Sequence, residues 1–187
     1  MSEEITEIRW HGRGGHGAVT SAELVAKAAI AEGKEARAFP SFGPERRGAP
    51  VQAFVRVSNG PPIRVRTEIT SPDIVVVLDP RLISVVDVTA GLRPGGLLVI
   101  NTKKALNSFP QFVQWRLATI DATNIAREVL GITIVNTTMV GALIKATGIV
   151  KIESFIQPLE DIFGRRAGDN FRAMQRAYQE TKTREVE

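Results

Sequence analysis

The chain has 187 residues, of which 43% are hydrophobic and 24% charged, and its formal net charge is +4. This length suits a single domain spanning residues 1–187, with enough chain to bury a large core. Lys and Arg are spread along the sequence without a basic block, so nucleic-acid binding is not expected. The chain has no cysteine, which excludes disulfides, thiol chemistry and cysteine ligands for an iron–sulfur cluster.

Neither the N-terminus nor the hydropathy of the chain indicates a membrane. The segment Met1–Glu4 is acidic and lacks the apolar centre of a signal peptide. No apolar run approaches the roughly 20 residues needed to span a bilayer. We therefore expect a cytoplasmic protein without membrane contact.

The first elements of the chain predict a βαβ unit. Ile5–His11 alternates weakly and is expected to be a strand, and Ala18–Glu32 is an alanine-rich segment typical of a helix. Gly33 is placed to cap the C-terminus of this helix, and Glu35–Phe39 predicts a second strand. The order strand, helix, strand predicts that the two strands are a parallel pair with a right-handed crossover.

Two alternating segments then predict an antiparallel hairpin. Val51–Val57 and Ile63–Thr67 flank an Asn59–Gly60 dipeptide, which is a common hairpin signal. This hairpin would make the sheet mixed, although mostly parallel.

The middle of the chain predicts strands that are buried on both faces. Asp73–Leu78 contains a continuous β-branched run, which is typical of a strand between two layers of helices. The further strands expected are Gly96–Ile100, Arg116–Ile120 and Ile132–Val135. The helices expected between and after these strands are 81–89, 121–131 and 138–147.

The C-terminal part of the chain is predicted to be helical. Apolar residues recur at helical spacing in a tail that begins at about Lys151, and the charged end Lys182–Glu187 is expected to fray. The predicted fold class is therefore α/β. It is a three-layer αβα sandwich with a mixed, mostly parallel sheet, one antiparallel hairpin and a helical C-terminus.

A glycine-rich segment lies between the first strand and the first helix. Its glycines would let backbone N–H groups approach an anion at the helix N-terminus. A dinucleotide fingerprint also needs an acidic residue at the end of the second strand, and Glu35–Phe39 has none there, although Arg37 could favour a 2′-phosphate. Two interpretations stay open, a tight turn alone or a contact with an anion or partner. The glycines concerned are Gly12, Gly14, Gly15 and Gly17.

The two histidines of the chain lie in or next to this segment. His11 and His16 without any cysteine make a poor metal site, so no metal ligand is assigned. The positive end of the helix dipole disfavours a charged imidazole at His16, which predicts a neutral hydrogen-bonding side chain. No catalytic residue can be assigned, because neither histidine has an identifiable proton-transfer partner.

The loop Pro40–Pro50 is the most unusual stretch of the sequence. Its three prolines and two glycines predict stiff, defined bends. The adjacent Arg46 and Arg47 suit recognition of phosphate or carboxylate, because each guanidinium offers a planar fork of donors. The alternative is a surface turn in which Glu45 pairs with an arginine.

Taken together, these motifs resemble the gamma subunit of 2-oxoacid:ferredoxin oxidoreductases, the pyruvate enzyme (pyruvate synthase) in particular. The resemblance rests on Ile8–Thr20 and Phe39–Pro50, and Val76–Pro80 and Val135–Leu143 also fit. It covers the chain from about Glu4 to Tyr178. One departure is His16, where the family usually has glutamine.

The resemblance implies a role within a larger redox complex of anaerobic metabolism. Enzymes of this family decarboxylate a 2-oxoacid on thiamine diphosphate, pass electrons through iron–sulfur clusters to external ferredoxin, and transfer the acyl group to coenzyme A. Thiamine-diphosphate-binding and ferredoxin-like subunits are the implied partners, and this chain is expected to bind no cofactor itself. The residues expected to face a ligand or a partner are Gly12, Gly14, Gly15, His16, Gly17, Ser41, Glu45, Arg46, Arg47 and Asn136.

The residues agree independently that the cofactors belong to other chains. Without cysteine the chain cannot ligate an ordinary cluster. The usual thiamine-diphosphate signature, Gly-Asp-Gly followed by Asn about 25 to 30 residues later, is missing. Two alternatives remain, a stand-alone NAD(P)-dependent oxidoreductase and a purely structural adaptor.

Overall fold

The computed structural model describes residues 5–41, 48–60, 62–65 and 67–186. Within these residues, one seven-stranded sheet has the strand order β2-β3-β1-β4-β5-β6-β7. The pairs β1–β4, β4–β5 and β5–β6 are parallel, and β1–β3, β2–β3 and β6–β7 are antiparallel. The mixed sheet is confirmed, with a larger antiparallel share than expected. The strands are β1 (Ile5–Arg13), β2 (Glu35–Pro40), β3 (Pro50–Ser58), β4 (Ile74–Val77), β5 (Leu97–Asn101), β6 (Arg116–Ile120) and β7 (Lys182–Arg184).

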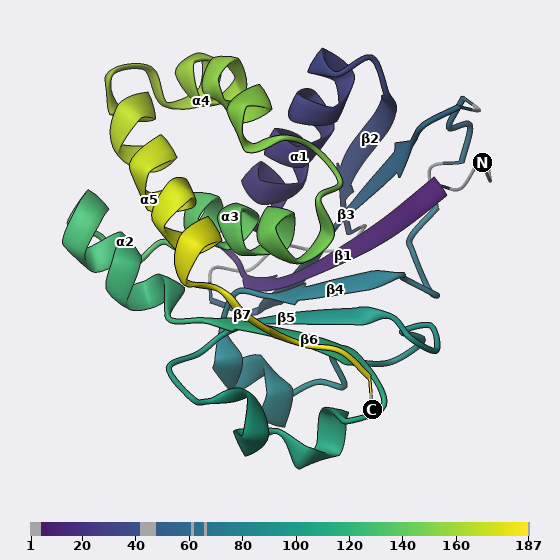
Figure 1. Cartoon of the computed structure of the whole chain (residues 1–187). Helices are drawn as coiled ribbons and strands as arrows, with labels where there is room; N and C mark the ends of the chain where they lie inside the picture. Colours follow the sequence, from purple (N-terminus) through teal and green to yellow (C-terminus); the bar gives the residue numbers. More distant parts are fainter. Residues whose placement is uncertain (1–4, 42–47, 61, 66, 187) are drawn as a thin grey trace.

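The sheet lies between two unequal outer layers (Figure 1). The α-helices cover one face, and short 3-10 helices and loops cover the other, so the sandwich has three layers but α-helices in only one of them. The α-helices are α1 (Ala18–Ala31), α2 (Ala122–Leu130), α3 (Asn136–Thr147), α4 (Ile156–Phe163) and α5 (Ala167–Glu180). The 3-10 helices on the second face are η1 (Pro80–Ser84), η2 (Leu106–Ser108) and η3 (Pro110–Phe112).

Two apolar clusters, one on each face, hold these layers together. Val76 and Val99 belong to the cluster under the α-helices, while Val75 and Leu98 belong to the cluster under the 3-10 helices. Strands β4 and β5 therefore bury side chains on both faces, as their β-branched runs predict. The helix expected over 81–89 is only the single turn η1, because the residues after it form turns and loops.

The order of the first three strands differs from the predicted βαβ pair. Strands β1 and β2 run in the same direction, but β3 lies between them and is antiparallel to both. The burial of the strands agrees with this order: Ala53–Ser58 of β3 is buried without interruption, whereas β2 is mostly half-buried and occupies the edge. Local strand order along the chain does not reveal which strand is inserted between two others.

The antiparallel hairpin exists, but it joins β2 to β3. The predicted partner Ile63–Thr67 is not a strand in its described residues, of which Ile63 is buried and Arg64 and Val65 are exposed. Pro61 and Pro62 just before it lack the N–H groups that a paired strand would donate. The Asn59–Gly60 signal therefore marks the end of β3, and no return strand follows it in residues 62–65 and 67–73.

The last strand of the sheet comes from the C-terminus. The predicted strand Ile132–Val135 is instead a connection between α2 and α3, and Ile132 and Ile134 are exposed. Strand β7 pairs with β6 in its place, so the expected fraying of the tail is wrong for residues 182–184. Arg184 donates hydrogen bonds to the carbonyls of Leu106 and Phe112 and thereby holds the tail in position.

Several predicted helix ends are confirmed. The Asp121 carboxylate accepts a hydrogen bond from the backbone N–H of Asn124 and caps α2. Gly131 and Gly148, both in the left-handed region, end α2 and α3. Among the residues that the structure describes, no helix combines the length and apolar character that crossing a bilayer requires.

Candidate functional site

The carboxyl ends of the four parallel strands β1, β4, β5 and β6 meet at one edge of the sheet. The chain leaves β1 through α1 toward β2, whereas it leaves β4 toward β5 on the opposite side. The strand order therefore reverses between β1 and β4. In α/β sheets, ligands bind at the carboxyl edge beside such a reversal, which makes this edge the candidate site.

The glycine turn, residues 12–17, connects β1 to α1 at this edge. Gly15 (φ 84°) and Gly17 (φ 82°) both lie in the left-handed region, where other residues are strained. Gly15 and His16 are exposed, and Gly12 is buried against Ala18 and Leu78. The turn thus has a buried base and an exposed tip.

Asn136 packs against the glycine turn from α3. A Cβ atom on Gly17 would lie only 2.7 Å from Nδ2 of Asn136. The N-termini of α1 and α3 therefore lie so close together that a side chain at position 17 would collide with Asn136. The Asn136 side chain is largely buried, and its Oδ1 accepts a hydrogen bond from the backbone N–H of Thr137. Asn136 therefore supports the turn from below, while His16 at the tip is open to solvent.

The described stem of the Pro40–Pro50 loop lies against the same turn. The Gly14 N–H donates to the Ala49 carbonyl at 3.0 Å, and the Gly48 N–H donates to the Gly14 carbonyl at 3.2 Å. On the other side of the loop, the Ser41 hydroxyl hydrogen-bonds Glu68 at 2.8 Å. Glu45, Arg46 and Arg47 lie outside the described residues.

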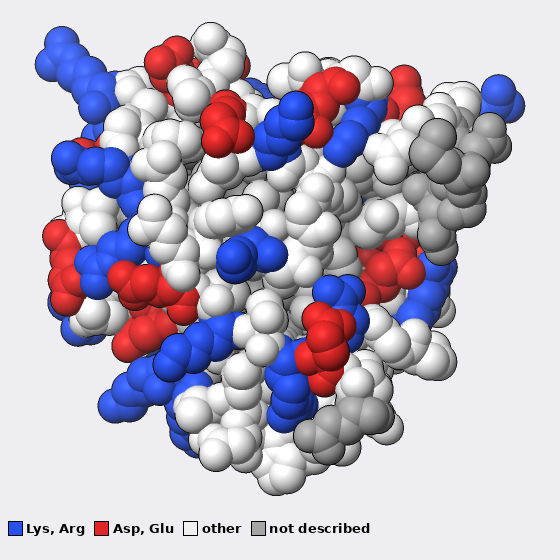
Figure 2. Space-filling view, in the orientation of Figure 1, with Lys and Arg blue, Asp and Glu red and all other residues white. Residues whose placement is uncertain are grey.

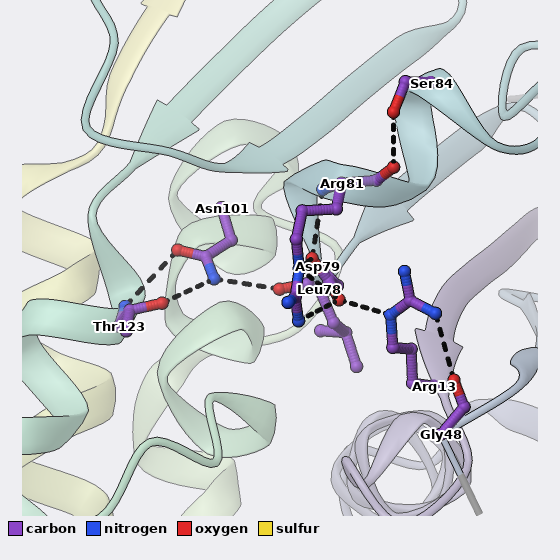
Figure 3. Close-up of polar contacts among 8 residues, drawn as sticks. All are labelled: Arg13, Gly48, Leu78, Asp79, Arg81, Ser84, Asn101 and Thr123. Carbon is purple, nitrogen blue, oxygen red and sulfur yellow. Dashed lines mark hydrogen bonds and ion pairs between the residues drawn. The ribbon is translucent and has the colours of Figure 1, made fainter.

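Asp79 connects this stem to the end of β4 (Figure 3). Nε of Arg13 lies 2.6 Å from an Asp79 carboxylate oxygen, and Nη1 of Arg13 donates to the Gly48 carbonyl at 3.0 Å. Arg81 hydrogen-bonds the same carboxylate through its backbone N–H and its guanidinium. One buried carboxylate thus links the end of β1, the loop stem and the start of η1.

The pKa of Asp79 reflects these contacts. Burial alone would raise the pKa of this carboxyl, but the hydrogen bonds from Arg81 and Arg13 outweigh burial and lower the pKa to about 2. Asp79 is therefore ionised at neutral pH. It serves as a fixed anion that orients arginines and is unsuited to accept a proton there.

Sequence patterns do not identify this role of Asp79. Arg13 and Asp79 are 66 residues apart, so no local spacing indicates the ion pair. The available signal is an Asp-Pro dipeptide directly after a buried strand, which is typical of a residue that caps a helical turn. Asp79 does cap η1.

Arg9 and His11 form a second buried polar pair on β1. Nε of Arg9 donates to Nε2 of His11 at 3.0 Å, and Arg9 also donates to the carbonyls of Val88 and Ala90. Burial, with a smaller contribution from the Arg9 charge, lowers the pKa of His11 to about 3. His11 is therefore a neutral hydrogen-bond acceptor inside the protein and is separated from the exposed tip of the turn.

We expect His11→Gln to reduce the acid sensitivity of the fold. Below pH 6.5 the His11 imidazole of the unfolded chain takes up a proton, whereas the folded imidazole does so only near pH 3. The free energy of unfolding therefore decreases as the pH is lowered, by up to about 1.4 kcal/mol per pH unit. Glutamine keeps an acceptor for Arg9 but does not titrate. Urea unfolding between pH 6.5 and 4.5 should give a shallower slope for the variant, and parallel slopes would contradict a neutral His11.

Charged side chains of both signs are interspersed over the face shown in Figure 2, without one continuous basic surface on that face. Among the described residues, no group of three or more His, Asp or Glu side chains is placed to hold a metal ion. The polar groups of the candidate site are instead backbone amides, arginines and the Asp79 carboxylate. Such a set can orient an anionic ligand or a partner loop.

Fold and site together define an α/β domain in which a glycine turn and a clamped loop stem meet at the reversal point of a mixed sheet. The model of the family "Pyruvate ferredoxin/flavodoxin oxidoreductase" matches residues 7–180. The pyruvate/ketoisovalerate oxidoreductases common subunit gamma of Pyrococcus furiosus is 50% identical over 186 residues, covering 97% of this chain and all of the relative.

Two further relatives agree with this match. The pyruvate synthase subunit PorC of Methanothermobacter marburgensis is 50% identical over 95% of this chain and 98% of the relative. The crystal structure of the pyruvate oxidoreductase subunit PORC of Thermotoga maritima superposes with a TM-score of 0.84 at 36% identity, covering 97% of this chain and 99% of that one. The chain therefore belongs to the pyruvate ferredoxin/flavodoxin oxidoreductase family, as a gamma-type subunit of a multi-subunit 2-oxoacid:ferredoxin oxidoreductase.

Proposed function

We propose that this chain completes the coenzyme A side of an active site whose remaining parts belong to partner subunits. The observation that carries the proposal is the joining of the glycine turn to the loop stem by the two Gly14 hydrogen bonds. Arg13, held by its ion pair with Asp79, adds a further hydrogen bond to the Gly48 carbonyl of the stem. A surface fixed in this way can hold a ligand with little loss of conformational entropy.

The residues proposed to contact coenzyme A or a partner are those of the turn and of the loop. Arg46 and Arg47 directly precede Gly48 in the chain. The Gly48 N–H donates to the Gly14 carbonyl of the turn, and the Gly48 carbonyl accepts from Arg13. Guanidinium groups bind phosphate through paired N–H donors, and coenzyme A carries several phosphate oxygens. Gly15 and His16 at the exposed tip are proposed to face the same ligand or a partner subunit.

Thiamine diphosphate and iron–sulfur clusters are proposed to lie in the partner subunits. The chain has no cysteine, so its residues do not fit a cluster, and the Gly-Asp-Gly signature for thiamine diphosphate is missing. When bound in the partners, these groups supply decarboxylation and electron transfer to ferredoxin. Thiamine-diphosphate-binding and ferredoxin-like subunits are accordingly the partners that we propose.

The proposed substrate is a 2-oxoacid, with pyruvate as the first choice. The PorC relatives carry the name of pyruvate synthase, whereas the gamma relative of Pyrococcus is named as common to pyruvate and ketoisovalerate oxidoreductases. A subunit shared by two oxidoreductases cannot select between their substrates. We therefore propose that selection of the 2-oxoacid resides in a partner subunit.

The strand order argues against a stand-alone NAD(P)-dependent enzyme. A dinucleotide fold holds the ribose with an acidic residue at the end of the parallel strand next to β1. Here the neighbour on that side is the antiparallel β3, which begins at this edge with Pro50. The strand β2 lies one position further away and ends in Phe39 and Pro40, without a carboxylate.

Replacing Arg46 and Arg47 together by alanine tests the proposal in the assembled enzyme. We expect the apparent KM for coenzyme A to rise about tenfold, which corresponds to about 1.4 kcal/mol, with the KM for pyruvate unchanged. The matched control removes two exposed arginines on the helical side, Arg165→Ala with Arg172→Ala. If assembly and both KM values are unaffected by the Arg46 and Arg47 replacements, the loop is not part of the coenzyme A side.

A further inference from the structure

A hollow of about 420 Å³ lies at the carboxyl edge, away from the glycine turn. It is formed by the loop that follows β5, by the first turns of α2 and by Pro80 at the start of η1. Asn101, Lys103, Lys104 and Arg127 are among its lining residues. In the strand order, β4 separates β5 from β1, so this hollow and the glycine turn lie on opposite sides of β4.

Cationic side chains predominate among the charged groups of this hollow. Lys103, Lys104 and Arg127 are exposed, and in the described part of the chain none of the three has a carboxylate within 4.0 Å. The lining carboxylate, Asp121, already accepts the Asn124 N–H as the cap of α2. Arg127 also lies close enough to Glu128 to lower the pKa of that carboxyl by charge attraction. An anion in the hollow would therefore meet three cationic side chains and one lining carboxylate, which is an excess of positive charge.

Hydrogen bonds fix the backbone that carries these cations. The Thr102 N–H donates to the Ile120 carbonyl at 2.7 Å, and the Lys104 N–H donates to the Thr102 hydroxyl at 3.1 Å. Nδ2 of Asn101 donates to the Thr123 hydroxyl and to the Leu78 carbonyl (Figure 3). The loop is thus tied to β6, α2 and β4 before any ligand arrives.

The recognising groups are side chains, because the helix N-terminus is already occupied. The N–H groups of Thr123 and Asn124 donate to Asn101 and Asp121. Two ammonium groups and one guanidinium suit an anion with several charged oxygens, since each offers multiple donors. The volume lies within the range of small-molecule pockets and is too small for a macromolecular domain.

We propose that this hollow is a second anion site of the chain and binds a small phosphate-bearing molecule through Lys103, Lys104 and Arg127. It does not depend on the function proposed for the glycine turn, because it uses other residues on another pair of strands. Asn101 and Thr123 act as positioning residues that hold the loop against the helix.

Titration of the full chain with pyrophosphate, followed by calorimetry in 0.15 M salt, tests the site. We expect saturable binding with a submillimolar Kd, and amide NMR shifts concentrated at Thr102–Lys104 and Thr123. Inorganic phosphate in a parallel titration shows whether one phosphate group suffices. Lys103→Gln with Lys104→Gln should weaken pyrophosphate binding at least tenfold without changing Tm, because both side chains are exposed.

The matched control removes two exposed lysines elsewhere, Lys27→Gln with Lys151→Gln, and should change Kd by less than twofold. An equal loss in both double variants would reduce the effect to general charge attraction and overturn the site, as would an absence of saturable binding. Binding that disappears in the assembled complex would also overturn it, because a partner subunit would then cover the hollow.

Discussion

Replacing Gly141 by alanine should lower the free energy of unfolding by about 3 kcal/mol, at the upper end of the cost of overpacking a core. Gly141 lies in α3 where the helix crosses α5, and a Cβ atom there would collide with the backbone carbonyl of Met174. A backbone atom cannot rotate away as a side chain can. The two helices would have to separate, and Ala173 and Met174 would lose part of their burial.

Urea unfolding of the isolated chain measures this effect, with Gly168→Ala as the matched control. Gly168 lies in α5, and a Cβ atom there would have no neighbour within 4 Å. Alanine is the better helix former, so the control should be neutral or stabilising by up to about 1 kcal/mol. If Gly141→Ala unfolded like the wild type, the close crossing of α3 and α5 would be wrong.

Replacing Gly17 by alanine should destabilise the chain more than the same change at Gly15. Both glycines have a positive φ, so each alanine carries a conformational cost of about 1 kcal/mol. Only the Gly17 replacement also places its Cβ 2.7 Å from Nδ2 of Asn136, whereas Gly15 has nothing within 4 Å. We expect a loss of about 3 kcal/mol at Gly17 and about 1 kcal/mol at Gly15.

Thermal unfolding of the two variants side by side provides the comparison. The difference between them isolates the contact between the glycine turn and α3, because the backbone strain is common to both. Equal losses of stability would show that Asn136 does not support the turn. In the assembled enzyme, the Gly17 variant should also raise the KM for coenzyme A, because the turn is shifted.

Local sequence patterns predict the buried strands and many helix ends. The β-branched run in β4 identifies a strand covered on both faces, and Gly131 and Gly148 end their helices where the sequence indicates. Pairing between distant segments is what these patterns miss. Nothing in the charged residues 182–184 indicates a strand, yet they complete the sheet because β6 has a free edge.

In the candidate site too, local features can be predicted from the sequence, whereas contacts between distant segments cannot. The glycine turn and the proline-rich loop each stand out in the sequence, and both are expected at the carboxyl edge because each follows a strand of the same direction. The Gly14–Ala49 bond and the Arg13–Asp79 pair join residues 35 and 66 positions apart in the chain. The Gly14–Ala49 bond depends on the insertion of β3 between β1 and β2, and the Arg13–Asp79 pair depends on the parallel pairing of β1 with β4. No local pattern predicts either arrangement.

The most direct test is to assemble the oxidoreductase from its subunits with and without this chain and to measure ferredoxin reduction that requires both pyruvate and coenzyme A. A complex that lacks the chain should lose coenzyme A-dependent turnover, and adding the purified chain should restore it. Full activity of the partner subunits alone would contradict the claim that this chain completes their active site.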